Sequence, residues 1–386
     1  MGMRVLFTSP PGLGHIHPMV PLARATAARG HDVLWATPAD GVRHVEETGI
    51  AAVATGPAGL PGPAEVRRRY PELDALPPVE MPDVMFGKIF GALAAPQILP
   101  DLVRVALDWR PDLVVADAAE FAGHIVAAEL GIPSVTKGFG ALLPERRVRA
   151  AGDEVAPLWR SRGLDPRPYG GSYDHLYVDI YPPEFGFGAA AHVPHRQRLR
   201  PVADDGHVET SSPLPLPDPA DAPLVYVTMG TVFNNPEVFE VVLAALHQLD
   251  VRALVTVGPE ADPAVLGPQP GRVRIERYVP QALVLPRCDV VVSHAGSGTV
   301  LATAAHGLPQ LCLPQGADQF LNAAAVESAG SGISLMPGGA TAGAVRDAVV
   351  RLLGEPAFRC AAGGVSVSIA SMPSPDDVAA VLETLP

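Results

Sequence analysis

The strongest constraint on the fold of this chain is an alternation of short apolar strands with helical segments, which runs twice along the sequence. In the first half, apolar runs at 3–8 and 31–37 flank a turn with two prolines and a helical segment over 18–29. The same strand–helix–strand order returns at 111–137. This order predicts a parallel sheet whose crossovers are helices. We therefore expect the first half to form one doubly wound α/β domain.

A second α/β domain is predicted after a linker. Residues 206–222 are rich in Pro, Ser and Asp and have little to bury, which is typical of a semi-rigid linker. Beyond them the alternation restarts, with strands expected at 224–230, 252–258, 273–278, 288–294 and 309–314, and helices at 236–249, 298–305 and 319–329. The sequence thus predicts domains at 1–205 and 223–386, with a capped helix over 374–385 that packs back on the first domain. A cleft between two facing carboxyl edges is the expected ligand site.

Two parts of the first half do not fit the alternation. Residues 56–82 and 144–200 are rich in Pro, Gly and Arg. We expect loops or short helices there, above the carboxyl ends of the strands, where such insertions shape a pocket.

The composition excludes several classes of partner. A formal net charge of −13 and a pI near 5.3 disfavour nucleic acid and anionic membranes, because both would repel such a surface. The three cysteines stand beside aliphatic residues rather than at metal-ligand spacing, which predicts reduced thiols in a cytosol. The N-terminal apolar run is too short for a signal or a membrane span, and no apolar run of 18 residues follows. We expect a cytoplasmic protein with a small-molecule partner.

The segment "SHAGSGT" at 293–299 predicts a phosphate site that needs no lysine. A glycine turn that opens a helix exposes unpaired backbone N–H groups and the positive end of the helix dipole, and both attract phosphate. His294 can add a hydrogen bond, and Thr231 can supply a hydroxyl from the neighbouring strand end. Lys88 and Lys137 are the only lysines, and neither stands in a Gly-Lys-Ser/Thr motif, which excludes a P-loop.

The next loop, "PQGADQFLNA", predicts a sugar site. Asp318 and Gln319 stand at the start of another helix, one strand further along the sheet. A carboxylate beside an amide suits the vicinal hydroxyls of a sugar. The alternative is that Asp318 is only an N-terminal helix cap and that the glycines only make turns. Because these residues follow one another on adjacent strand ends, the binding interpretation is favoured.

Two histidines follow the first strand in "PPGLGHIHP". The third glycine of a dinucleotide fingerprint would fall at His17, so binding of NAD loses its main support. A neutral histidine at a strand end can take a proton from a hydroxyl, and an aspartate on its other nitrogen fixes the tautomer. His15 and Asp117, the latter ending "LVVAD", are candidates for these two roles, although Asp117 as a strand-end cap stays open. We expect His17 at the start of a helix, without a direct role.

One long segment resembles a known family. Residues 278–323, "YVPQALVLPRCDVVVSHAGSGTVLATAAHGLPQLCLPQGADQFLNA", resemble the donor-binding signature of nucleotide-sugar-dependent glycosyltransferases with the GT-B fold. Among these the chain is most similar to bacterial natural-product transferases that decorate macrolides, enediynes and aromatic polyketides. The N-terminal 9–33 and the C-terminal 370–385 share the resemblance. It implies an α/β protein with two facing Rossmann-like doubly wound domains and a cleft between them.

The resemblance also implies roles for individual residues. It places the catalytic general base at His15, with Asp117 as its partner. It places the pocket for the nucleobase of the donor at Tyr278 and Val279, where many relatives have Trp-Val. The diphosphate motif covers His294, Gly296, Ser297, Gly298 and Thr299. The sugar motif covers Pro314, Gln315, Asp318, Gln319, Asn322 and Ala323.

These observations predict an inverting O-glycosyltransferase that moves a hexose or deoxyhexose from a TDP- or UDP-sugar to a hydroxyl of a hydrophobic natural-product aglycone. No D-x-D pair occurs in the chain, so no metal and no other cofactor is expected. The sequence permits a homodimer. The alternatives are a nucleotide-sugar epimerase or hydrolase on the same fold, and a catalytically silent nucleotide-binding auxiliary subunit.

Overall fold

The chain forms two compact units. The computed structural model describes residues 2–76, 80–186, 190–203, 214, 216–217, 221–230, 236–258 and 261–385. Unit 1 comprises Met1–Ile180, Gly188–Leu199 and Pro373–Pro386, and unit 2 comprises Tyr181–Phe187 and Arg200–Met372. Most of the expected linker at 206–222 lies outside the described residues.

Unit 1 contains a seven-stranded sheet in the order β3-β2-β1-β4-β5-β6-β7, and every neighbouring pair is parallel. The strands are β1 (Arg4–Thr8), β2 (Asp32–Thr37), β3 (Ala52–Ala54), β4 (Leu113–Asp117), β5 (Ser134–Lys137), β6 (Leu176–Asp179) and β7 (Arg196–Arg198). The chain runs outward from β1 to β3 and then returns to β4 on the other side of β1. The predicted doubly wound α/β sheet is confirmed, and its topological switch point lies between β1 and β4.

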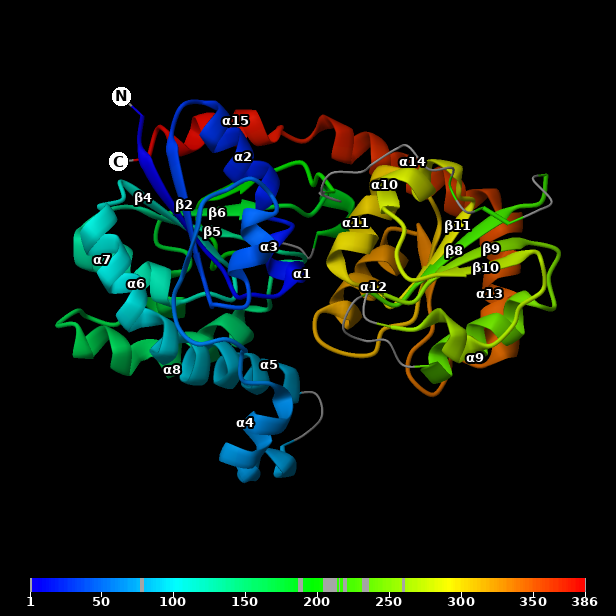
Figure 1. Ribbon diagram of the computed structural model, residues 1–386, viewed down its shortest axis with the longest axis horizontal. Helices are drawn as coiled ribbons and strands as arrows, with labels where there is room; N and C mark the ends of the chain where they lie inside the picture. The colour runs from blue at the N-terminus through cyan, green and yellow to red at the C-terminus, as the bar shows by residue number, and fades with distance from the viewer. Residues whose placement is uncertain are drawn as a thin grey trace. The chain divides into compact units, whose positions relative to one another are not determined.

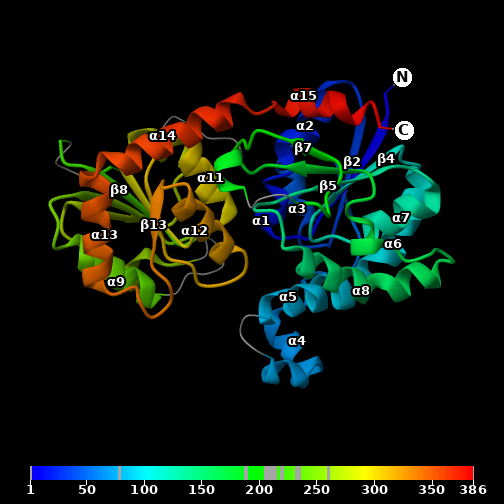
Figure 2. The same cartoon turned by 180° about the vertical axis from the view of Figure 1, so that it is seen from behind.

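Helices cover both faces of this sheet. The helices of unit 1 are α1 (Leu13–Ile16), α2 (Val20–Ala28), α3 (Val42–Glu46), α4 (Pro63–Arg69), α5 (Met81–Phe86), α6 (Ala95–Trp109), α7 (Ala122–Leu130), α8 (Glu145–Ser161) and α15 (Pro375–Leu382). Apolar side chains of α6, α7 and α8 form one core with β1 and β4, including Leu99, Ile125 and Trp159. In both views α5 lies beside α8, and α4 projects away from the sheet (Figure 1, Figure 2).

The expectation of loops or short helices over 144–200 is wrong. This range contains the 17-residue helix α8 and the strands β6 and β7. In α8, Val148, Ala151, Val155 and Trp159 recur at helical spacing and are buried, but the many arginines and Pro157 obscure this pattern in the sequence. The range 56–82 does contain the expected short helices, α4 and a 3₁₀ turn at Pro71–Ala75.

One long apolar helical stretch lies in unit 1. Among the described residues, Met81–Trp109 is the one helix long and apolar enough to cross a membrane, judged by length and composition alone. It consists of α5, the π-helical turn Gly87–Ala94 and α6. In the structure it packs against α7 and α8, which gives its apolar residues partners inside unit 1.

Unit 2 contains a six-stranded sheet in the order β10-β9-β8-β11-β12-β13, again with parallel pairs. Its strands are β8 (Leu224–Thr228), β9 (Arg252–Thr256), β10 (Val273–Glu276), β11 (Val290–Ser293), β12 (Gln310–Cys312) and β13 (Gly332–Ser334). Its helices are α9 (Pro236–Leu246), α10 (Gln281–Val284), α11 (Ser297–Ala305), α12 (Gln319–Ser328), α13 (Ala342–Gly354) and α14 (Pro356–Ser371). The switch point of this sheet lies between β8 and β11.

The last helix, α15, returns to unit 1 and packs on α2. Ser374 begins it with a capping box, in which its side chain accepts a hydrogen bond from the Asp377 N–H and the Asp377 carboxylate accepts one from the Ser374 N–H. Glu383 near its end accepts hydrogen bonds from Arg29 Nε at 2.7 Å and from His31 Nε2 at 3.0 Å. The capped helix expected over 374–385 is therefore present.

A buried histidine makes unit 1 sensitive to acid. Burial lowers the pKa of His124 from its ordinary 6.5 to about 3. Its Nδ1 lies 3.0 Å from Ser134 Oγ and its Nε2 lies 3.1 Å from Thr136 Oγ1, so both nitrogens of the neutral ring have hydrogen-bond partners.

We expect unit 1 to lose stability as the pH falls through this window. Between pH 6.5 and 3 the unfolded chain binds a proton at His124 that the folded chain does not bind, so stability falls with falling pH. The loss from this residue at about pH 5 is about 2 kcal/mol. Chemical unfolding at about pH 7 and about pH 5 measures it, with His124→Gln as the comparison. The account is contradicted if the pH dependence is the same in both proteins.

Candidate active site

The switch point of unit 1 brings His15 and Asp117 together. His15 lies in α1, directly after β1, and Asp117 is the last residue of β4. The distance from His15 Nδ1 to Asp117 Oδ1 is 3.0 Å. Asp117 is fully buried, whereas 20 % of the His15 side chain is exposed. Nδ1 faces the carboxylate, and Nε2 is the ring nitrogen that points away from this contact.

Asp117 is held in place by the backbone of its own loop. Its Oδ1 also accepts a hydrogen bond from the Ala119 N–H at 2.8 Å. The alternative role as a strand-end cap is therefore real, but it coexists with the contact to His15. One oxygen thus both fixes the loop and orients the imidazole.

Two aromatic rings flank His15, and the sequence analysis missed both. The ring centroid of Phe139, just after β5, lies 4.7 Å from that of His15, and the centroid of Phe90 lies 5.8 Å away. Both rings meet the imidazole edge to face. The surroundings of the histidine are therefore apolar and partly exposed. Phe139 stands at a strand end, which was the available signal, but Phe90 depends on the π-helical turn.

His17 does not start a helix as expected. It is the C-terminal cap of α1 and is exposed. The difference arises because the chain forms the short helix α1 before α2, so that the turn after β1 is itself helical.

The switch point of unit 2 carries the predicted phosphate segment. Gly296 is the N-cap residue of α11 and offers no side chain to its first turn. The His294 ring lies against two glycines, because a Cβ added at Gly296 or at Gly230 would lie 2.6 Å from atoms of this ring. Burial lowers the pKa of His294 to about 4, against the opposing effects of Asp318 and the Thr228 backbone. The ring is therefore neutral near pH 7 and is fixed beside the helix N-terminus.

Asp318 joins the phosphate segment to the next loop. Its Oδ2 accepts hydrogen bonds from Ser297 Oγ at 2.7 Å and from Asn322 Nδ2 at 2.9 Å. Asp318 is the N-cap residue of α12, but its side chain makes no capping hydrogen bond there. The simple cap interpretation is therefore wrong for this side chain. Tyr181, in the segment that joins unit 2, donates a hydrogen bond to Asn322 Oδ1.

Gln319 organises the loop before its own helix. Its Oε1 accepts hydrogen bonds from the Gln315 N–H at 2.7 Å and the Gly316 N–H at 3.1 Å. Both loops also contain an alanine in the left-handed region, Ala295 with φ 63° and Ala317 with φ 53°. A non-glycine residue costs about 1–2 kcal/mol there, and such strain is concentrated at functional sites.

The other residues predicted to bind the nucleotide of the sugar donor differ in their contacts and in their exposure. Thr299 Oγ1 accepts a hydrogen bond from Gln281 Nε2 at 3.1 Å, a contact that the sequence analysis missed. Tyr278 is 53 % exposed, whereas Val279 is buried in a core cluster that includes Val284 of α10. Gly298 is exposed on the first turn of α11. Thr231 lies outside the described residues.

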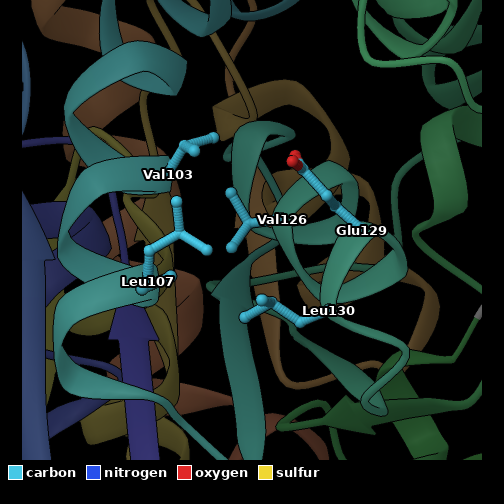
Figure 3. A pocket seen from close by; sticks show the side chains of 6 residues that line it. Val103, Leu107, Val126, Glu129 and Leu130 are labelled. Atoms are coloured by element: carbon cyan, nitrogen blue, oxygen red, sulfur yellow. The ribbon is translucent and has the colours of Figure 1, made fainter.

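Two hollows in unit 1 are lined by residues outside the candidate site. Pro144, Glu145, Arg146 and Arg149 line one hollow of about 580 Å³ at the start of α8. Figure 3 shows a smaller one, where Val103 and Leu107 of α6 face Val126 and Leu130 of α7. Its one charged residue, Glu129, accepts a hydrogen bond from Arg162 Nε at 2.8 Å.

Comparison with known proteins identifies the family. The family described as erythromycin biosynthesis protein CIII-like matches with its N-terminal domain at residues 83–161 and its C-terminal domain at 240–385. The elloramycin glycosyltransferase ElmGT of Streptomyces olivaceus is 35 % identical, over 99 % of this chain and 97 % of its own. The chain belongs to this family. It is a bacterial natural-product glycosyltransferase.

Two further proteins are similar to this glycosyltransferase over nearly its whole length. The TDP-daunosamine transferase DnrS of Streptomyces peucetius is 31 % identical over 99 % of this chain and 97 % of its own. The structure of the spinosyn rhamnosyltransferase SpnG complexed with thymidine diphosphate matches with a TM-score of 0.83 and 28 % identity, over 99 % of this chain and 100 % of that one. The GT-B fold predicted from the sequence is confirmed.

Proposed function

We propose that this glycosyltransferase is an inverting O-glycosyltransferase that moves a deoxyhexose from a TDP-sugar to a hydroxyl of a hydrophobic aglycone. The observation that carries this proposal is the contact of His15 Nδ1 with Asp117 Oδ1 at the switch point of unit 1. Its relatives support TDP as the nucleotide, since DnrS is named for TDP-daunosamine and SpnG binds thymidine diphosphate.

His15 is the general base in this proposal, and unit 1 is the acceptor-binding domain. Asp117 fixes the tautomer with the proton on Nδ1, so Nε2 removes the proton of the acceptor hydroxyl. The deprotonated oxygen forms a bond to the anomeric carbon as the bond from that carbon to the diphosphate breaks on the opposite face. Asp117 stabilises the imidazolium that results. The rings of Phe90 and Phe139 give a hydrophobic acceptor an apolar surface beside the base.

Unit 2 is the nucleotide-sugar-binding domain in this proposal. The first-turn N–H groups of α11 and the dipole of this nine-residue helix stabilise the departing diphosphate, and His294 adds a hydrogen bond. Tyr278 supplies an exposed ring that contacts the nucleobase, and Asp318 and Gln319 bind the sugar. The reaction takes place in the cytoplasm.

We expect transfer to be independent of divalent metal ions. The negative charge of the diphosphate is met by backbone N–H groups and His294, and no D-x-D pair is available as a ligand set. Initial rates in excess EDTA, with added Mg²⁺ and with added Mn²⁺ test this. If EDTA abolishes transfer and a divalent ion restores it, the proposed diphosphate site is wrong.

We expect Asp318→Asn to weaken binding of a TDP-sugar by about 10-fold, because one charge-assisted hydrogen bond to a sugar hydroxyl becomes a neutral one. The amide oxygen can still accept from Asn322, so the loop is retained. Binding of TDP alone should change little. Calorimetric titration of both ligands separates the effects, and equal weakening would place Asp318 in the scaffold.

A further inference from the structure

Charged residues of alternating sign stand on four neighbouring strands of the unit 1 sheet, beginning with Asp117 of the proposed base pair, and the first three stand at the carboxyl ends of their strands. Asp117 ends β4, Lys137 ends β5, Asp179 ends β6, and Arg196 begins β7. The first three side chains are fully buried. Arg196 Nε donates a hydrogen bond to Asp179 Oδ2 at 2.7 Å, so the outer pair neutralises itself.

Lys137 is the direct neighbour of Asp117 in the sheet. The two residues are register partners across β4 and β5, so their side chains leave the same face of the sheet. Lys137 Nζ donates a hydrogen bond to the Gly138 carbonyl at 2.8 Å and thus stays at this edge. Asp117 Oδ1 is used by His15 and Ala119, whereas Oδ2 is buried and has no hydrogen-bond donor among the described residues.

A buried carboxylate with one unsatisfied oxygen needs compensation of its charge, since an isolated buried charge is strongly disfavoured. Burial lowers the pKa of Lys137 to about 7, and the nearby carboxylates of Asp117 and Asp179 oppose this shift. Below about pH 7 the amine therefore carries a positive charge beside Asp117.

We propose that Lys137 is a positioning residue for the reaction, whose ammonium group compensates the charge of Asp117 and thereby keeps the His15–Asp117 pair in its active protonation state. This inference rests on the proposed role of that pair. The pair carries one negative charge when it is active and none when it has bound a proton. A neighbouring positive charge favours the active form, so transfer reaches its maximum at a lower pH than it would without Lys137.

The groups near this site that can titrate or carry charge come from several neighbouring elements. They are His15 of α1, Asp117 of β4, Glu120 after β4, Tyr177 and Asp179 of β6, and Arg196 of β7. Burial raises the pKa of Glu120 and of Tyr177, which favours the neutral forms of both. Apart from the proposed base pair itself, Lys137 is the group in this set whose pKa burial brings near neutral pH.

The test is the pH profile of transfer, measured as kcat/KM for the acceptor at saturating TDP-sugar. Lys137→Met should shift the rising limb to higher pH by about one unit, while Lys137→Arg should leave it in place. The matched control is Lys88→Met, which removes the only other lysine, an ammonium 2.6 Å from Glu154 Oε1. It should not move the limb. In an Asp117→Asn background, Lys137→Met should have little further effect. An unmoved limb in Lys137→Met overturns the proposal.

A second measurement does not need activity. Because the chain contains two lysines, a sample labelled with ¹⁵N at lysine Nζ gives two signals, and Lys88→Met assigns the one from Lys137. Asp117→Asn should lower the pH at which the Lys137 signal titrates, since coupling between two groups is reciprocal. An unchanged titration overturns the proposal even if Lys137→Met does not fold. If His15→Ala retains transfer, the proposed function fails instead, and this titration still reports whether Lys137 and Asp117 are coupled.

Discussion

Replacing His15 with alanine should reduce transfer by about 10²-fold to 10⁴-fold, because the general base is lost. Binding of TDP should stay close to that of the unchanged protein, since His15 lies in unit 1 and the proposed diphosphate site lies in unit 2. The loss should appear in kcat and in kcat/KM together, as for an interaction made only in the transition state. Steady-state kinetics with a calorimetric titration of TDP measure both parts.

The matched control is His17→Ala. His17 stands two residues away, at the end of α1, and is exposed. It should retain nearly full transfer. A comparable loss in both variants would indicate damage to α1, and full activity of His15→Ala would place the base elsewhere.

Replacing Gly296 with alanine should weaken binding of TDP by about 10-fold to 100-fold. The new Cβ would lie 2.6 Å from His294 Nε2, closer than real Cβ contacts come, and Gly230 also lies against this ring. The ring must therefore move, and one hydrogen bond to a charged phosphate oxygen is lost, which corresponds to about 1.5–3 kcal/mol. Fluorescence or calorimetric titration with TDP measures the change.

Gly343→Ala is the control for this variant. Gly343 lies in the first turn of α13 in the same unit, and no atom stands within 4 Å of a Cβ added there. It should bind TDP as the unchanged protein does. Normal binding by Gly296→Ala would show that the position of His294 does not matter for the diphosphate.

Periodicity and turn chemistry predict the sheets of both units well. The strands at 4–8, 113–117 and 290–293 are short runs of buried aliphatic residues between turn residues, so their type follows from local sequence. The helix α8 was missed because its apolar positions are separated by arginines and its length includes Pro157. Its helical structure depends on the core that it forms with α6 and α7, which no local pattern records.

The candidate site was only partly predictable for a similar reason. The expected proximity of His15 and Asp117 follows from a rule of topology, since both stand at carboxyl ends of neighbouring parallel strands. The contacts of Phe90 and Lys137 depend on how the π-helical turn Gly87–Ala94 and the strand β5 pack, which the sequence does not specify. Asp318 shows the limit of local rules most clearly, because it occupies a cap position but bonds to Ser297 and Asn322 instead.

The most direct test of the central claim is to incubate the purified chain with a TDP-deoxysugar, with and without a panel of polyphenolic and macrolactone aglycones, and to follow both substrates by mass spectrometry. The account predicts that TDP is released at an appreciable rate only when an acceptor is present, and in equal amount to a glycoside whose anomeric configuration is inverted. Consumption of the TDP-sugar at the same rate without an acceptor would contradict it and indicate an epimerase or hydrolase. Failure to turn over any TDP-sugar that the chain binds, with every acceptor tried, would contradict it in favour of an auxiliary nucleotide-binding subunit.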